Sequence, residues 1–243
     1  MNCITLFIFY IIALSLSLLN NNNNGKYQAF YQDDGLQAAS TGSQDSLLQQ
    51  IGPGIYKFGE IIIDKNENYI EFPAAVNMDK GLIEYILVGV LGKLHESLFF
   101  TKVEPYQIKT ALLLYGFKDS GVEFRGQGYE DFLKGDSLEI WVSWDEGEKN
   151  LTRVEQLVFN QRTEHTMQRT NWIFTGSYFY QGRFIAQIEK SIIAVYYDPI
   201  AVINNPLPER INDEIWYVNE DKVPKIGTEV KIIFREVENN IQR

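Results

Sequence analysis

A histidine, a carboxylate and a hydroxyl occupy three consecutive positions, His95, Glu96 and Ser97. These are the side-chain types of a hydrolytic triad, in which the acid orients the histidine that activates the hydroxyl. Adjacent side chains on a strand point to opposite faces, however, so Glu96 would point away from the other two. No nucleophile-elbow sequence of the G-x-S-x-G kind surrounds the serine. A hydrolase built on His95 and Ser97 would therefore need a carboxylate from a neighbouring strand, and Glu84 is one candidate.

Two predicted strands, 82–91 and 94–101, must position these residues, and both are rich in apolar side chains. A Gly-Lys pair lies between them and predicts a turn, so we expect the two strands to form a hairpin. In the register of that hairpin, Glu84 would lie four residues from the position opposite His95, at about 13 Å. This separation argues against a direct contact between Glu84 and His95.

A binding role is a second interpretation of this cluster. Lys93, His95, Glu96 and Ser97 would present polar side chains at one end of the hairpin, and Tyr85 on the paired strand would add a phenol. A structural interpretation stands beside it, because buried polar side chains need partners and could satisfy main-chain groups or one another. Adjacent ligands on opposite strand faces hold a metal ion poorly, so we expect no metal site here and no cofactor.

The composition excludes several classes of protein. A chain with a net charge of −10 would repel a phosphate backbone, so we expect no nucleic-acid partner. The single cysteine, Cys3, lies outside the predicted folded part. That part therefore has no disulfide, thiolate metal site, iron–sulfur ligand or cysteine nucleophile. No G-x-G-x-x-G or P-loop sequence predicts a nucleotide site.

The N-terminal residues 1–19 contain an uncharged apolar run, 4–19, which is followed by five asparagines. A membrane-spanning helix needs about 20 apolar residues and the apolar region of a signal peptide about 7–15. The run therefore fits a signal peptide or an N-terminal membrane anchor. Both place the folded part outside the cytoplasm, with membrane contact only through this segment. Residues 20–50 are rich in Asn, Gln, Ser and Gly and are predicted to be a disordered polar linker.

Residues 51–238 are predicted to form one mainly β domain of the α+β class with an antiparallel sheet, because apolar residues mostly alternate. One principal helix is expected at 105–115, where a proline takes the first position, apolar residues recur with helical spacing and Gly116 follows. The glycine-rich, charged stretch 119–136 is a loop or a seam between two halves. The other predicted strands are 55–58, 60–63, 69–72, 137–144, 152–159, 172–175, 178–180, 183–188, 191–197 and 229–237.

Several spaced motifs lie between residues 52 and 235: FPAxVN at 72–77, the strand 81–88 with its Glu84–Tyr85 pair, GKxHES at 92–97, ALLLxG at 111–116, NWIFTGSYFYQGRFIAQ at 171–187 and DPIAVINNP at 198–206. Together they resemble the YdjY-type domain of bacterial envelope and electron-transfer proteins. The resemblance implies a domain of a bacterial envelope, periplasmic or membrane-tethered, without naming a reaction. Some relatives carry cysteine-rich iron–sulfur segments. Their redox role does not transfer to a chain with no cysteine after Cys3.

These observations favour an exported or envelope-tethered, non-catalytic module that binds a protein or a small ligand, with the cluster around His95 as its polar site. Enzymatic activity stays open, and the alternative is a hydrolase that uses His95 and Ser97. A third interpretation is a structural scaffold, which predicts an exposed apolar face or an open sheet edge. An open cleft that brings His95 and Ser97 within hydrogen-bonding distance would favour the enzyme, whereas burial against the main chain would not.

Overall fold

The computed structural model describes most of the predicted folded part of the chain. The predicted signal peptide or anchor lies outside the described residues, as do nearly all of the predicted linker and most of the stretch 119–136. No helix within the described ranges is both long and apolar enough to cross a bilayer. The described residues are 48–119, 133–144 and 151–237.

β-Strands are the main secondary structure of the described residues, and helices are fewer. The helices are α2 Pro105–Tyr115 and α3 Ile185–Glu189, and three 3-10 turns span Leu94–Glu96, Val154–Leu157 and Pro208–Ile211. The strands are β1 Leu48–Gly52, β2 Ile55–Phe58, β3 Ile61–Asp64, β4 Tyr69–Val76, β5 Tyr85–Gly89, β6 Ser97–Thr101, β7 Ser137–Ser143, β8 Leu151–Arg153, β9 Val158–Asn160, β10 His165–Thr166, β11 Trp172–Ile173, β12 Phe179–Tyr180, β13 Arg183–Phe184, β14 Ser191–Ala194, β15 Ile203–Asn204, β16 Trp216–Val218 and β17 Glu229–Glu236.

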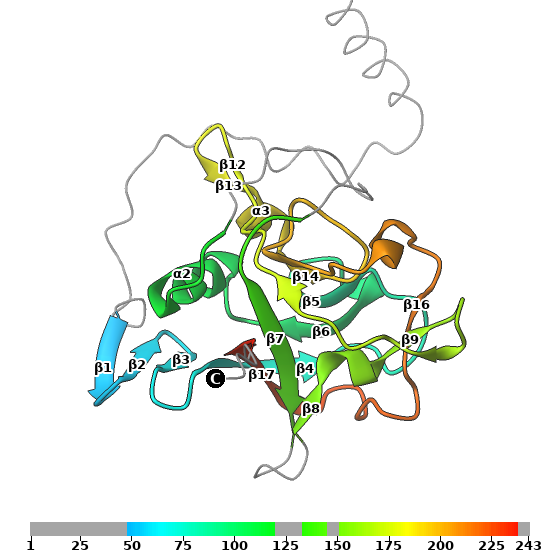
Figure 1. Ribbon diagram of the computed structural model, residues 1–243, viewed down its shortest axis with the longest axis horizontal. Helices are drawn as coiled ribbons and strands as arrows, with labels where there is room; N and C mark the ends of the chain where they lie inside the picture. The colour runs from blue at the N-terminus through cyan, green and yellow to red at the C-terminus, as the bar shows by residue number, and fades with distance from the viewer. Residues whose placement is uncertain (1–47, 120–132, 145–150, 238–243) are drawn as a thin grey trace, which may run out of the picture. The chain divides into compact units, whose positions relative to one another are not determined.

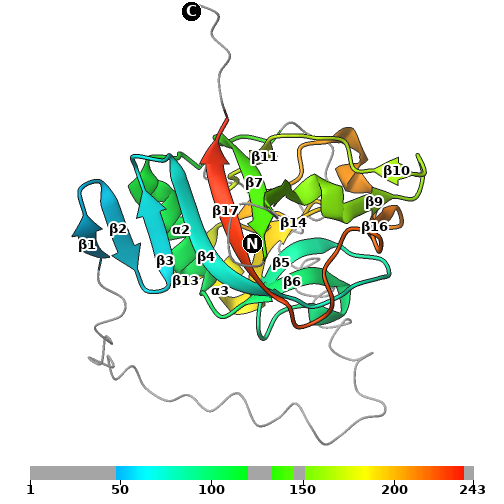
Figure 2. The ribbon, with the colours of Figure 1, turned by 90° about the horizontal axis from the view of Figure 1, so that it is seen from below.

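Eight strands close into a barrel, in the order β4, β17, β7, β11, β15, β14, β5, β6 and back to β4. β4 closes the barrel. It pairs with β17 along one edge, and along its other edge it pairs first with β3 and then, near its end, with β6. Beyond the closure, β1, β2 and β3 extend the sheet to one side (Figures 1 and 2). A three-stranded sheet, β10-β9-β16, and the β12-β13 hairpin complete the fold.

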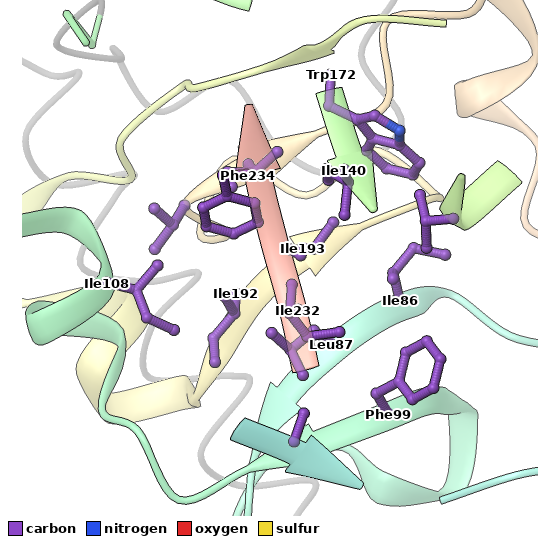
Figure 3. Close-up of a cluster of buried hydrophobic side chains, with 14 of the residues drawn as sticks. Ile86, Leu87, Phe99, Ile108, Ile140, Trp172, Ile192, Ile193, Ile232 and Phe234 are labelled. Atoms are coloured by element: carbon purple, nitrogen blue, oxygen red, sulfur yellow. The ribbon is translucent and has the colours of Figure 1, made fainter. Parts of the chain in front are cut away.

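The inside of the barrel is filled by large apolar side chains from many strands (Figure 3). Trp172 of β11, Phe99 of β6 and Phe234 of β17 are all without solvent contact. Along β4, β7 and β17 buried and partly exposed residues mostly alternate, which is the pattern of strands with one face on a core. The period-two pattern in the sequence therefore correctly predicted strands at β4, β7 and β17.

The predicted helix at 105–115 is confirmed as α2. Pro105 takes the first helical position, and the main-chain N–H of Glu104 donates to the Gln107 side chain, which closes a capping box. Gly116 ends the helix with a φ of 125°, a conformation that side chains disfavour. In Figure 2, α2 lies behind β3 and β4, so the opposite face of these strands is turned away from the helix.

The sheet is mixed, and the prediction of an antiparallel sheet is wrong in two places. Strands β5 and β6 run parallel, with Tyr85 opposite Ser97, and β14 and β15 also run parallel. The predicted hairpin over 82–101 is therefore absent. Gly92 N–H donates to the carbonyl of Gly89, and the 3-10 turn Leu94–Glu96 follows at once. These two tight turns return the chain to the start of β5. β6 therefore begins beside the start of β5 and runs in the same direction.

The predicted strand 183–188 is also wrong beyond its first two residues, because 185–189 form α3. The helical turn is held by its contact with the start of α2. Gln187 accepts a hydrogen bond from Tyr106 N–H and donates one to Glu104, which also binds the Lys190 ammonium at 2.5 Å. Tertiary contacts of this kind override the local preference of a short apolar segment.

Candidate functional site

Lys93, Tyr85 and Asp198 form a chain of hydrogen bonds beside the parallel pair β5 and β6. Lys93 Nζ donates to the Tyr85 hydroxyl at 2.7 Å, and this hydroxyl donates to Asp198 Oδ2 at 2.7 Å. Tyr85 has no solvent contact and Asp198 almost none, whereas 36% of the Lys93 side chain is exposed. The chain of hydrogen bonds therefore links an ammonium group at the surface to a buried carboxylate.

Burial raises the pKa of the Tyr85 phenol far above its usual value, and the charge of Asp198, which accepts its hydrogen bond, raises it further. The buried Ser191 hydroxyl beside it acts in the opposite direction but does not reverse the shift. The phenol stays protonated under all ordinary conditions and acts as a hydrogen-bond donor. Tyr85 therefore cannot serve as a general base.

The buried end of this chain is fixed by a second set of polar residues. Asp198 N–H donates to Asn204 Oδ1 at 2.9 Å, and Asn204 Nδ2 donates to Thr175 Oγ1 at 2.9 Å. At the surface end, Asn77 Nδ2 donates to the carbonyls of Leu94 and Ser97 and so holds the 3-10 turn in place. Residues from five of the sequence motifs thus meet in one network.

Ser97 and His95 do not form the arrangement of a hydrolytic site. Ser97 is completely buried, and its hydroxyl donates to the main-chain carbonyl of Lys93 at 2.6 Å. The His95 side chain is 79% exposed, and its Nε2 lies 3.5 Å from Glu96 Oε2. Glu96 therefore lies beside the imidazole, because the 3-10 turn replaces the strand in which neighbours would point apart. The serine hydroxyl remains bound to the main chain.

Glu84 lies much closer to this cluster than the predicted hairpin implied. In the parallel register Glu84 N–H donates to the carbonyl of Glu96 at 2.9 Å. Burial raises the pKa of the Glu84 carboxyl, the charge of Glu96 raises it further, and the Lys93 ammonium lowers it. The structure thus gathers Lys93, Glu84 and Glu96 at the surface, with Tyr85 below them.

The residue that the sequence interpretation missed at this cluster is Asp198. Asp198 belongs to the DPIAVINNP motif, but the sequence does not show that its partner is Tyr85, which lies 113 positions earlier. The cluster as a whole is well suited to fix the crossing between β5 and β6. The Tyr85 and Ser97 hydroxyls and the Asp198 carboxylate are already hydrogen-bonded, so they present little to a substrate.

A large groove lies elsewhere, on the outer face of β4, β17 and β7, with a volume of about 1190 Å³. Its floor is formed by the outward side chains of β17, from Glu229 through Lys231 and Ile233 to Arg235. This face is opposite α2 and is the one turned to the viewer in Figure 2. Tyr69 on β4 and Trp144 after β7 provide aromatic surface along its walls.

Several charged groups in and beside the groove are paired. The Lys231 ammonium binds Glu71 Oε1 at 2.7 Å across β17 and β4. On β7, Glu139 binds the guanidinium groups of Arg153 at 2.6 Å and Arg169 at 3.1 Å, and it accepts the indole N–H of Trp141 at 2.9 Å. Burial alone would raise the pKa of Glu139, but these hydrogen bonds and the charge of Arg153 lower it.

The sequence interpretation gave no role to any residue of this groove. The available signal was the outward positions of the last strand, where charged residues alternate with the buried apolar ones. That signal could place Lys231 and Arg235 on an outer face, but not beside Glu71 or Trp141. These partners lie on strands far apart in the chain, and only the sheet order brings them together.

Comparison with known proteins gives one match. A family model described as the YdjY domain matches residues 61–235. No curated protein and no solved structure matches the chain. The matched range begins at β3 and ends inside β17, so it includes every strand of the barrel, the Lys93–Tyr85–Asp198 chain and nearly all of the groove.

Proposed function

The chain belongs to the YdjY domain family, and we propose that its domain is a non-catalytic module that binds an extended polypeptide segment in the outer groove. The observation that supports this proposal is the size of the groove. Its volume of about 1190 Å³ exceeds what a small molecule fills, since ligand pockets measure about 300–1,000 Å³. The proposal includes a location outside the cytoplasm, which the apolar run 4–19 supports.

The shape of the groove fits an extended chain. Its floor follows β17 over the outward positions 229 to 235. At about 3.4 Å per residue, this distance is about 20 Å and matches six or seven residues of an extended peptide. Aromatic residues and arginine are enriched in surfaces that bind proteins. Tyr69, Trp144 and Arg235 provide that combination in the groove.

A structural assembly role is a second candidate, and one observation favours it. Strand β1 pairs with β2 on one side, and no other described strand pairs with it. Its residues Leu48 and Ile51 are 45% and 55% exposed. An edge strand with exposed apolar side chains can pair with another chain. The hydrolase alternative has less support, because the Ser97 hydroxyl is buried and bound to the main chain.

Filling the groove tests the proposal. Ala75 lies on its wall, so Ala75→Trp should occupy part of the groove without removing an existing contact. The full chain and this variant are screened against a library of random-sequence peptides. The proposal expects peptides that bind the unchanged protein and lose at least tenfold in affinity to Ala75→Trp, about 1.4 kcal/mol.

A matched control places the same side chain elsewhere. Ser137 is an exposed strand residue on β7 that does not line the groove, so Ser137→Trp should bind the selected peptides as the unchanged protein does. Equal binding of these peptides to all three proteins would show that they bind elsewhere. Either that result or the absence of any selected peptide contradicts the proposed function.

A further inference from the structure

Arg235 lies at one end of the groove, between two strands of the barrel wall. In the register of the sheet, Arg235 lies opposite Tyr69 of β4 and opposite Glu139 of β7. Its guanidinium lies 5.9 Å from the Trp141 ring. The side chain is partly exposed and lines the groove. At this distance the guanidinium can make a cation–π interaction with the indole, and its planar fork matches the geometry of a carboxylate.

Every acidic side chain that faces Arg235 from a neighbouring strand has another partner. Glu139 is bound to Arg153, Arg169 and Trp141, and Glu71 is bound to Lys231. Within the described ranges, no ion pair or hydrogen bond involves the Arg235 side chain, and its buried Nε has no hydrogen-bond partner. A guanidinium has five N–H donors, so those of Arg235 that are not buried are available to an acceptor in the groove.

Arg235 is the cation beside Trp141 that no described carboxylate binds. The two other guanidinium groups nearby, those of Arg153 and Arg169, are bound to Glu139 and Glu155. Tyr69 contributes a phenol whose pKa is raised by burial and then by the carboxylates of Glu71, Asp64 and Glu67, although Arg235 lowers it. The phenol is therefore a neutral hydrogen-bond donor at physiological pH.

We propose that Arg235 binds a carboxylate of the polypeptide in the groove, through the two-pronged geometry that guanidinium and carboxylate groups share. This inference rests on the proposed function and deepens it by naming the ligand as a carboxylate-bearing segment. The carboxylate belongs to an Asp or Glu side chain or to a C-terminus. The Trp141 ring lies beside the guanidinium, and the Glu71–Lys231 pair adds no net charge.

The first test observes Arg235 directly. The Nε–H signal of Arg235 in the full chain, identified in ¹H–¹⁵N spectra by its loss in Arg235→Lys, is followed during titration with three small probes. N-acetylglutamate α-amide carries a side-chain carboxylate, N-acetylglycine a terminal one, and N-acetylglutamine α-amide none. We expect the signal to move with one or both carboxylates and not with the glutamine derivative. Equal movement with all three, or none with any, overturns the inference.

The second test uses the peptides selected with the unchanged protein. Converting the carboxylate of a selected peptide to an amide should weaken binding by about tenfold or more, as expected for a charge-assisted hydrogen bond. In Arg235→Gln the acid and its amide should bind alike, and Arg235→Lys should restore part of the difference because it keeps the charge without the planar fork. Lys102→Gln, which removes an exposed positive charge elsewhere on the groove, should keep the full preference.

The outcomes separate this inference from the proposed function. Peptides that bind in the groove with no preference for a carboxylate would contradict the role of Arg235 and leave the binding module intact. A signal that moves with carboxylates, without any peptide binding, would contradict the polypeptide ligand and keep Arg235 as an anion site. The absence of any peptide binding, together with an Arg235 signal that no carboxylate moves, contradicts both.

Discussion

Asp198 is a carboxylate with almost no solvent contact, and its environment explains how the fold accommodates a buried charge. It accepts hydrogen bonds from the Tyr85 hydroxyl and from the Ile200 main chain, and the Lys93 ammonium lies one hydroxyl away. A buried charge without such partners would cost several kcal/mol. At this position the YdjY motifs act together as a structural unit, since each supplies a partner that the others need.

Replacing Tyr85 by phenylalanine tests this account. Tyr85→Phe keeps the buried ring but removes the hydroxyl between Lys93 and Asp198. The loss should lower the free energy of unfolding by about 1–3 kcal/mol, because a buried carboxylate loses its side-chain donor. Urea unfolding followed by circular dichroism measures the change. Tyr180→Phe, at a 61% exposed tyrosine, should leave the transition in place; equal stability of both variants would contradict the structural role of the network.

The helix and most barrel strands could be predicted from sequence because their signals are local. Pro105 and Gly116 mark the ends of α2, and alternation of apolar residues marks β4, β7 and β17. The direction of β6 could not be predicted, since Gly92 and Lys93 resemble a hairpin turn. The Gly89 N–H instead donates to the carbonyl of Lys190, a contact between distant segments that no local signal shows.

The crossing between β5 and β6 leads to a prediction at Gly92. A Cβ atom there would lie 3.0 Å from the Val88 side chain and 3.1 Å from both the Gly89 carbonyl and the Lys190 side chain. Gly92→Ala should therefore destabilise the protein by about 1–3 kcal/mol through overpacking. Chemical denaturation provides the measurement. At Gly52, where the nearest atom would be 3.5 Å away, alanine should change stability much less; the reverse order would refute the crossing as described.

The candidate site was only partly predictable for a related reason. Lys93 and Tyr85 belong to motifs that are close in sequence, so they could be selected as polar candidates, and the structure places them in contact. Arg235, Trp141 and Tyr69 lie on three different strands, and they become neighbours only because β17 is inserted between β4 and β7. No short motif contains that information.

The whole barrel and its flanking sheet share one continuous apolar core. Trp172 belongs to the barrel strand β11 and Trp216 to the separate sheet β10-β9-β16, and both are completely buried in that core. Domains built on one core usually unfold in a single cooperative transition. We therefore expect the two sheets to unfold together.

Tryptophan fluorescence tests this cooperativity. Trp216→Phe keeps Trp172 as the buried reporter, and Trp172→Phe keeps Trp216. In each variant, the urea midpoint from fluorescence should coincide with the midpoint from far-ultraviolet circular dichroism, although both variants will be less stable than the unchanged protein because a core side chain becomes smaller. Separate midpoints within one variant would show that the flanking sheet unfolds independently.

The insertion of β17 also shapes how the protein must be made. Lys231 on β17 meets Glu71 on β4, 160 positions earlier in the chain. During translation, β4 and β7 therefore leave the ribosome long before β17 is made. Their edges that pair with β17 have no partner strand until then. A protein truncated before residue 229 would expose the edges of β4 and β7 that normally pair with β17. We expect such a protein to aggregate rather than to fold into a less stable barrel.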